Sequence, residues 1–390
     1  MITHTTDVAI IGAGPSGLLL SQLLHLDGIS SILVERTSRA RVLSRIRAGV
    51  LERGTLDGLA EAGVDARLQA ERIDHDGVTL AFDGDVLEIP VHGLTGHHVV
   101  VYGQTEVTRD LIEAAEARGQ TILWDCPDAQ LSDLRTAPRV QLSAPDGTKH
   151  EIKAQLLAGC DGFHGICRQA IPAAQARVFE REYPFGWLGL LVDRPPVAHN
   201  VVYANHREGF ALASMRSATR SRYYVQSDPG DRVEDWPEAR FWEAFQTRMG
   251  DMGKRVEIGP ALEMSIAPLR SFVSEPMSYG RMFLAGDAAH IVPPTGAKGL
   301  NLAVADVRRL ARAISRWKGG CEEGLAAYSD AALARVWKVE RFSWYLTKLM
   351  HQFPTHSAFE KRMQRAEFDY IASSPAAQTM IAENYVGLDF

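Results

Sequence analysis

A chain of 390 residues is longer than a single hydrophobic core usually supports, so we expect two or three packed lobes, for which the apolar content of 46% is ample. The net charge of -6 argues against nucleic acid or an anionic membrane surface as the main partner. The four cysteines have the spacing of neither metal ligands nor a disulfide framework, so we expect no metal site and a cytoplasmic protein. The sequence shows no secretory-signal layout and no apolar run long enough to span a bilayer, which favours the same location.

The first forty residues predict a dinucleotide-binding βαβ unit. A short apolar strand leads through a glycine-rich turn into an apolar helix, and a second strand follows over 31–35. Gly12 permits the tight turn, Gly14 lets the backbone approach a pyrophosphate, and Gly17 lets the helix pack closely against the strand. Glu35 ends the second strand, where a carboxylate can accept hydrogen bonds from ribose hydroxyls.

The middle of the chain adds elements to this lobe and then changes character. We predict a helix over 105–119, a hairpin over 139–154 that turns at Asp146-Gly147, and a strand over 156–160. Residues 176–280 are rich in predicted strands, with one helix around residues 238–250, and should form an antiparallel sheet that carries the substrate.

Within this region, the stretch 211–226 predicts a hairpin turned at "SATRS". Strand side chains alternate, so Ser214, Arg216, Arg222 and Tyr224 share one face. This turn would place Arg216 opposite Arg222, and Ser214 opposite Tyr224. Two facing guanidinium groups repel each other unless an anion or solvent lies between them. The pattern therefore indicates either a water-facing sheet or an anion site.

A further apolar strand ends just before Asp287, and a Pro/Gly loop leads from there into a helix that begins near Gly299. An aspartate at the end of a strand can hold a ribityl hydroxyl, and a helix N-terminus can stabilise negative charge on a reduced flavin ring. A nicotinamide cofactor has no use for the ribityl contact, so the pattern favours FAD, although Asp287 could also serve as an ordinary cap.

The fold class that we predict is α/β, with a Rossmann-like FAD-binding domain over 1–175 that is completed by 281–310. An antiparallel-sheet substrate domain follows over 176–280, and a helical C-terminal region over 291–390. The amphipathic, aromatic run at 334–353 could pack against the lobes or form a dimer surface.

Three motifs resemble those of the single-component, FAD-dependent aromatic hydroxylases: the glycine turn with Glu35, "AGCDGFHG" at 158–165 and "GDAAHIVPPTGAKGLN" at 286–301. Other similar stretches, spread along nearly the whole chain, are "SRIRAGVLE", "VYGQTEVTRDL", "YPFGWLGLL", "SATRSRYYVQ", "SIAPLRSF" and "ENYVGL". The resemblance implies a homodimer that hydroxylates 4-hydroxybenzoate at C3 to 3,4-dihydroxybenzoate. It also implies FAD as cofactor, NADPH or NADH and O2 as co-substrates, and a C4a-hydroperoxyflavin as oxidant.

The resemblance also implies the residues of the site. Those expected at the substrate are Ser214, Arg216, Tyr224, Tyr203, Arg222 and Pro294. Those expected in catalysis are Tyr203, Tyr385, His75 and Pro294. Those expected to bind FAD are Gly12, Gly14, Gly17, Glu35, Arg45, Arg47, Gln104, Asp287, Gly299, Leu300 and Asn301. Those expected along the path of the nicotinamide coenzyme are Arg36, Arg41, His164, Arg168 and Arg270.

In this scheme Ser214, Arg216 and Tyr224 hold the substrate carboxylate, while Arg222 lies nearer the flavin. Oxygen transfer needs the phenolate, whereas a free phenol has a pKa of about 10. A chain of Tyr203, Tyr385 and His75 would carry the phenol proton to solvent. Lys298 would add positive potential near the flavin ring.

Several alternatives stay open from the sequence. Only one dinucleotide fingerprint is present, so the nicotinamide coenzyme should dock transiently on a surface. Arg36, Arg39 and Arg41 could meet a 2'-phosphate, which favours NADPH, or could belong to a solvated loop. The substrate could instead be 4-aminobenzoate or 3-hydroxybenzoate, and a non-catalytic FAD-fold binding protein is the alternative from another class.

Overall fold

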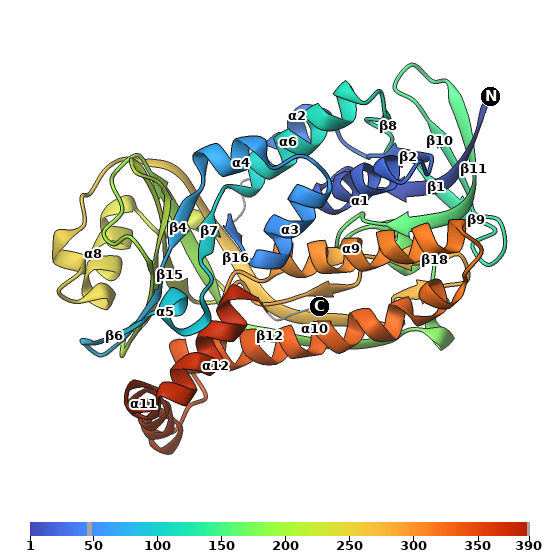
Figure 1. The fold of residues 1–390 in the computed structure, drawn as a ribbon. Helices are drawn as coiled ribbons and strands as arrows, with labels where there is room; N and C mark the ends of the chain where they lie inside the picture. The colour runs from blue at the N-terminus through green and yellow to red at the C-terminus, as the bar shows by residue number, and fades with distance from the viewer. Residues whose placement is uncertain (45–48, 388–390) are drawn as a thin grey trace.

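The computed structural model describes residues 1–44 and 49–387, and their strands form two eight-stranded sheets and one three-stranded sheet (Figure 1). The predicted α/β class is confirmed, with mixed sheets followed by a helical C-terminal region. No helix in the described ranges combines the length and apolar character that crossing a bilayer would require.

The first sheet is built around β1 (Ile2–Ile11), which pairs in parallel with β2 (Ser31–Val34) and β11 (Lys149–Gly159). The second half of β1 is continuously buried, as expected for a parallel strand covered on both faces. The hairpin predicted over 139–154 is confirmed by the pairing of β10 with β11. The other strands are β8 (Thr121–Leu123), β9 (Gln130–Ser132), β10 (Arg139–Ser143), β17 (Ser278–Tyr279) and β18 (Met282–Leu284).

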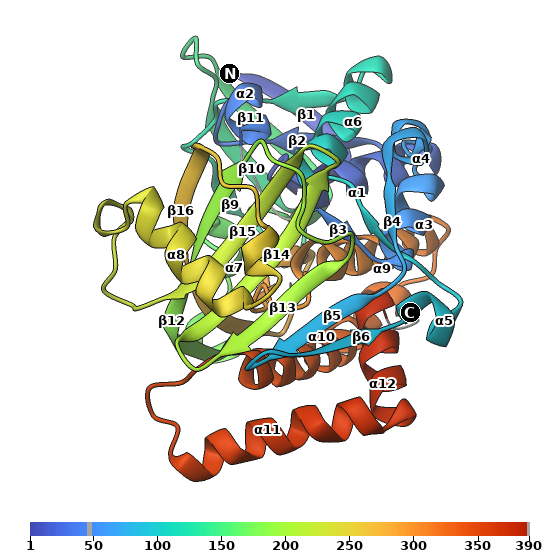
Figure 2. The same ribbon diagram turned by 90° about the vertical axis from the view of Figure 1, so that its left-hand side faces the viewer.

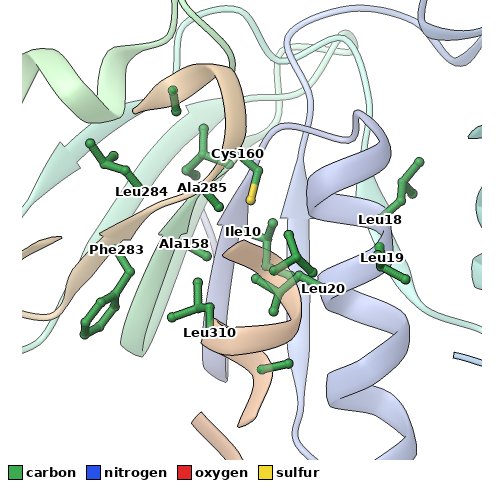
Figure 3. Close-up of a cluster of buried hydrophobic side chains, with 14 of the residues drawn as sticks. Ile10, Leu18, Leu19, Leu20, Ala158, Cys160, Phe283, Leu284, Ala285 and Leu310 are labelled. Carbon is green, nitrogen blue, oxygen red and sulfur yellow. The ribbon is translucent and has the colours of Figure 1, made fainter. Parts of the chain in front are cut away.

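Two helices from opposite halves of the chain share the core of this sheet. α1 (Pro15–Leu26) packs against α9 (Gly299–Lys318), and also against α6 (Gln104–Ala117), the helix predicted over 105–119. Figure 3 shows the result: Ile10 of β1 lies beside Leu20 of α1 on the side of Leu310 of α9, whereas Leu18 and Leu19 project from the other side of α1. The strand–turn–helix at the start of the chain and the one that precedes α9 are thereby fixed relative to each other.

The second sheet has the strand order β19-β16-β12-β15-β14-β13-β5-β6 and is antiparallel except for the β13·β5 pair. α8 (Glu238–Met249) covers one face, as Figure 2 shows, through Phe241, Trp242 and Phe245. The hairpin at 78–89, which lies within the expected 1–175 domain, pairs with this sheet. The strands are β5 (Val78–Phe82), β6 (Asp85–Ile89), β12 (Arg177–Val192), β13 (Val201–His206), β14 (Gly209–Ser217), β15 (Arg220–Ser227), β16 (Ala261–Glu275) and β19 (His290–Ile291).

The hairpin of β14 and β15 has the predicted faces but not the predicted pairing. Ala211, Ala213, Tyr223 and Val225 pack toward α8, which confirms the alternation. However, Ser214 lies opposite Arg222, not opposite Tyr224, and Arg216 has no direct partner. The turn is tighter than "SATRS", because Ser217 already pairs with Arg220, and a bulge at Arg216 absorbs the extra residue. The prediction that the two arginines face each other is therefore wrong.

The remaining elements surround the region between the sheets. The three-stranded sheet consists of β3 (Val50–Leu51), β4 (Ile73–His75) and β7 (Val99–Val101). The short helices are α2 (Arg39–Leu43), α3 (Arg53–Glu61), α4 (Ala66–Glu71), α5 (Val91–Thr95) and α7 (Ile166–Gln169). The C-terminal helices are α10 (Glu323–Met350), which packs along α9 (Figure 1), α11 (Ala358–Ser373) and α12 (Pro375–Val386).

Candidate active site

A cavity of about 510 Å³ is lined by residues of both large sheets and of α9. It brings together thirteen of the residues predicted from the sequence: Gly12, Gly14, Glu35, Arg36, Gln104, His164, Arg222, Tyr224, Asp287, Pro294, Lys298, Gly299 and Leu300. Arg45 and Arg47 lie outside the described residues. The cavity therefore joins the predicted dinucleotide site to part of the predicted substrate site.

The three glycines of the first turn differ in what a side chain at each position would contact. Gly12 has φ +103°, and a Cβ there would lie 2.3 Å from the Cys160 carbonyl oxygen. A Cβ on Gly17 would lie 2.0 Å from the Gly12 carbonyl oxygen, so Gly17 is required for helix–strand packing. At Gly14 a Cβ would meet nothing within 4 Å, because Gly14 faces the cavity. Protein packing does not require Gly14, but the close approach of a pyrophosphate would.

Two carboxylates face the same cavity. Glu35 is buried and accepts hydrogen bonds from the Ala13 amide at 2.9 Å and the Thr37 hydroxyl at 2.8 Å, which fixes it beside the turn with lone pairs left over. Asp287 follows β18 within a short 3-10 helix (Gly286–Ala288) and is exposed to the cavity. Both positions fit acceptors for sugar hydroxyl groups, as an FAD site requires.

The start of α9 supplies backbone donors. Leu302 is the first α9 residue whose amide reaches a carbonyl of the preceding turn, so the amides of Gly299, Leu300 and Asn301 have no acceptor within the helix. An N-terminus of this kind favours a negatively charged group. Together with the glycine turn and the two carboxylates, these residues fit the pyrophosphate, sugar and ring portions of FAD.

The Asn301 side chain already makes all of its hydrogen bonds within the protein. Its Oδ1 accepts from the Glu52 amide at 2.9 Å and the Thr55 hydroxyl at 2.7 Å, and its Nδ2 donates to the carbonyls of Val50 and Ala297. Any contact of Asn301 with a cofactor must therefore come from its backbone amide, and the side chain holds the 50–55 segment against α9.

Only some of the residues predicted to bind the substrate line the cavity. Arg222 and Tyr224 line the cavity together with Trp187, whereas Ser214 and Arg216 are half-buried on the same sheet face and do not belong to its lining. The Arg216 Nε is shielded from solvent and makes no hydrogen bond within the described ranges. A half-buried guanidinium whose shielded Nε has no partner is a group that binding of an anion would satisfy.

Tyr203 and Tyr385 meet in the interior beside the Pro294 loop. Both are almost fully buried, and the Tyr203 hydroxyl accepts a hydrogen bond from the Gly296 amide at 3.2 Å. Burial raises the pKa of both phenols, and the neighbouring Tyr203 hydroxyl raises that of Tyr385 further. The two hydroxyls are neighbours, but the Tyr385 hydroxyl has no hydrogen bond of good geometry among the described residues. Both phenols are therefore protonated donors at neutral pH.

His75, the predicted outer end of the relay, is itself buried at the end of β4. Its ring lies 5.2 Å from that of exposed His199, and its Nε2 has no partner within the described ranges. Burial lowers the pKa of His75 to about 4, with His199 acting in the same direction and Asp74 and Asp76 opposing it. His75 is consequently neutral at pH 7, with an unprotonated ring nitrogen that can accept a hydrogen bond.

The residues predicted for the nicotinamide coenzyme do not form one patch. Arg36 and His164 line the cavity, and Arg41 is exposed on α2. Arg168 and Arg270 stack on the Phe163 ring at 4.7 and 4.9 Å.

Internal partners hold both stacked arginines. Arg168 donates to the carbonyls of Phe163 and Ala288, and Arg270 pairs with Glu180 and Glu182. Coenzyme contact by Arg168 or Arg270 would therefore compete with these existing interactions.

Sequence reasoning missed Glu263 and Ser265 of β16, which contact Arg222 from beyond the intervening strand β12. A signal was present: Gly189 interrupts a run of large apolar residues in β12, and a glycine inside a strand marks a close approach. It also missed His351, whose Nε2 accepts a hydrogen bond from the Trp187 indole at 2.7 Å.

Comparison with known proteins gives a consistent result. A family model described as "FAD binding domain" matches residues 5–343. The chain is 49% identical to p-hydroxybenzoate hydroxylase of Acinetobacter baylyi, covering 100% of this chain and 97% of that protein. It is 25% identical to 3-amino-4-hydroxybenzoate 2-monooxygenase of Streptomyces cremeus, covering 90% and 89%. The crystal structure of p-nitrophenol 4-monooxygenase from Pseudomonas putida superposes with a TM-score of 0.80 at 19% identity, covering all of both chains.

The different environments of Gly14 and Gly17 lead to a paired prediction. Gly14→Ala should leave the free energy of unfolding of the flavin-free protein within about 0.5 kcal/mol of wild type, because its Cβ meets open space. Its affinity for FAD should nevertheless fall by at least about tenfold, because the methyl group occupies the pyrophosphate approach. Gly17→Ala should lower the unfolding free energy itself by about 2 kcal/mol or more.

Urea unfolding measures the change in stability, and fluorescence titration with FAD measures the change in affinity. Equal losses of stability in both variants would contradict the assignment of Gly14.

Proposed function

Because the chain belongs to the FAD-binding-domain family, we propose that it is an FAD-dependent monooxygenase that hydroxylates 4-hydroxybenzoate at C3 to give 3,4-dihydroxybenzoate. The observation that carries the proposal is the full-length, 49% identity to p-hydroxybenzoate hydroxylase. Two further observations support it: the sheet face that carries Arg222 and Tyr224 of the cavity also carries Arg216, whose Nε makes no hydrogen bond in the described ranges, and a buried tyrosine pair lies beside the Pro294 loop.

When bound and reduced by NAD(P)H, FAD would supply the activation of O2, one atom of which enters the ring while the other leaves as water. The role of the protein is to hold the substrate and to favour its phenolate form. Arg216 grips the carboxylate, and the hydroxyls of Ser214 and Tyr224 complete its hydrogen bonds. Trp187 and Pro294 form walls of the cavity that exclude water from the reacting groups.

The environment of Tyr203 explains how the phenolate is favoured. Its oxygen already accepts from the Gly296 amide, so its own O–H is available to donate to the 4-oxygen of the substrate. That donation stabilises the phenolate more than the phenol. Tyr385 and neutral His75 continue the route along which the phenol proton leaves, and buried His75 passes it outward beside exposed His199.

For the coenzyme we propose NADPH, supported by Arg36 at the cavity and by exposed Arg41 nearby. A cytoplasmic location accords with this coenzyme and with cysteines that are all unpaired in the described part of the chain.

Product analysis tests the proposed reaction. Purified protein with FAD, O2 and 4-hydroxybenzoate should form 3,4-dihydroxybenzoate in near-equal amount to the NADPH consumed, and more slowly with NADH. Tyr203→Phe removes the O–H donor, so it should still oxidise NADPH but release mainly hydrogen peroxide. Faster product formation from 4-aminobenzoate or 3-hydroxybenzoate would assign a different substrate, and coenzyme oxidation unaffected by any of these acids would contradict an aromatic hydroxylase.

The unpaired guanidinium of Arg216 predicts its contribution to binding. Arg216→Ala should weaken 4-hydroxybenzoate binding by about 2 kcal/mol, or roughly 30-fold, because a charge-assisted contact is lost. Arg220→Ala is the matched control, since Arg220 lies in the same hairpin but is exposed and pairs with Asp193 at 2.6 Å. Titration of the flavin absorbance with 4-hydroxybenzoate gives both dissociation constants. An Arg216→Ala constant equal to that of the control would remove Arg216 from the carboxylate site.

We further propose that the protein is a homodimer that uses the outer face of α10. Trp337 and Trp344 are each 40% exposed, and with Phe179 they line an open groove of about 330 Å³. Aromatic exposure of this extent favours contact with another protein surface. Light scattering should give twice the chain mass of 42.9 kDa for wild type. Trp344→Arg should shift the mass toward that of one chain, and a dimer unaffected by it would place the interface elsewhere.

A further inference from the structure

Arg222 is a buried cation whose charge is compensated from two strands away. It is 5% exposed on β15, yet its Nη1 donates to Glu263 of β16 at 3.2 Å and its Nη2 donates to the Ser265 hydroxyl at 2.9 Å. The Ser265 hydroxyl in turn donates to Glu263 at 3.1 Å. These three side chains form a closed hydrogen-bonded group on the cavity face of the sheet.

Gly189 of the intervening strand β12 makes this contact possible. It pairs with Tyr224 on one side and Ser265 on the other, directly beneath the path of the guanidinium. A Cβ at position 189 would lie 2.8 Å from the Arg222 Nη2 and 2.7 Å from the Tyr224 ring. Any larger residue would clash with the guanidinium in the position from which it reaches β16.

The same sheet face therefore presents two arginines in opposite electrostatic states. Arg216 is half-buried and forms no ion pair within the described ranges, whereas Arg222 lines the cavity with a carboxylate held against it. A guanidinium buried without a counter-ion is costly and attracts any available anion. Without Glu263, Arg222 would be a second binding site for an aromatic carboxylate, at the position nearer the flavin.

We propose that Glu263, supported by Ser265, is a positioning residue that neutralises Arg222 and so leaves Arg216 as the carboxylate anchor. The arrangement fixes which end of the aromatic ring points toward the flavin and excludes a reversed or displaced binding mode. This inference rests on the proposed function for its meaning in catalysis, but the charge arrangement itself can be tested without turnover.

Glu263→Gln removes the charge and keeps the shape and an acceptor oxygen. The binding test uses the FAD-loaded protein and benzoate, a carboxylate that lacks the 4-hydroxyl group. Benzoate affinity should rise at least about fivefold, because the uncompensated Arg222 becomes an anion site. A variant that was merely damaged would bind benzoate more weakly. During turnover of 4-hydroxybenzoate, the share of NADPH that ends in hydrogen peroxide should rise several-fold, with little change in KM.

Glu257→Gln is the matched control. Glu257 is an exposed carboxylate on the loop just before β16 and makes no hydrogen bond or ion pair with Arg222 among the described residues, so this variant should behave as wild type. Ser265→Ala removes only the neutral partner and should raise benzoate affinity and uncoupling less than Glu263→Gln does. If Glu263→Gln fails to fold, the benzoate titration is made on Ser265→Ala instead.

Unchanged benzoate affinity and unchanged coupling in the folded variant would overturn the inference. Failure of wild type to hydroxylate 4-hydroxybenzoate would instead overturn the proposed function, while the benzoate titration would still report the role of Glu263.

Discussion

The buried ion pair between Glu52 and Lys298 is the interaction on which the geometry of the cavity most depends. Both side chains are almost fully buried, and the carboxylate and ammonium groups approach to 2.5 Å. The ammonium also donates to the carbonyls of Asn384 and Tyr385. One contact thus joins the segment before α3, the loop before α9 and the end of α12. A buried pair of this kind is costly to form and more costly to break, so it fixes one arrangement of the three segments.

This ion pair is part of a larger charged group around Lys298. Burial lowers the pKa of Lys298, and the adjacent Glu52 opposes that effect. Lys298 lines the cavity, and the Glu52 carboxylate is shared with buried Arg335 at 3.4 Å, so two cations face one anion. The expectation that Lys298 adds positive potential near a flavin ring stays a prediction. Arg222 is likewise a cavity cation that contacts a carboxylate, Glu263, from outside the cavity lining.

The sequence alone was sufficient where the determining contacts are local. The glycine turn, Glu35 and the faces of the β14–β15 hairpin follow from spacing and from the two-residue period of a strand, and an even shift in pairing leaves those faces unchanged. The pairing itself could not be read, because it depends on a tight turn and on a bulge at Arg216. Glu263 could not be assigned for a different reason. Gly189 signals a close approach to β12, but the contact of Glu263 with Arg222 passes over β12, and no local pattern encodes which strands lie on its two sides.

The end of α10 supports two walls of the cavity, although none of its residues belongs to the lining. The Trp187 indole donates to Nε2 of buried His351, and the other ring nitrogen of His351 lies 2.9 Å from the Thr347 carbonyl. Burial lowers the pKa of His351 to about 3, so the ring is neutral and only the tautomer with a proton on Nδ1 satisfies both contacts.

The same turn of α10 reaches the opposite wall. The Thr347 hydroxyl is hydrogen-bonded at 3.0 Å to that of Thr295, the neighbour of Pro294. The last turn of α10 therefore positions both the Trp187 wall and the Pro294 loop. Because these two walls close the space in which an aromatic ring would lie, the width of that space is set by a helix more than 150 residues away from Trp187 in the sequence.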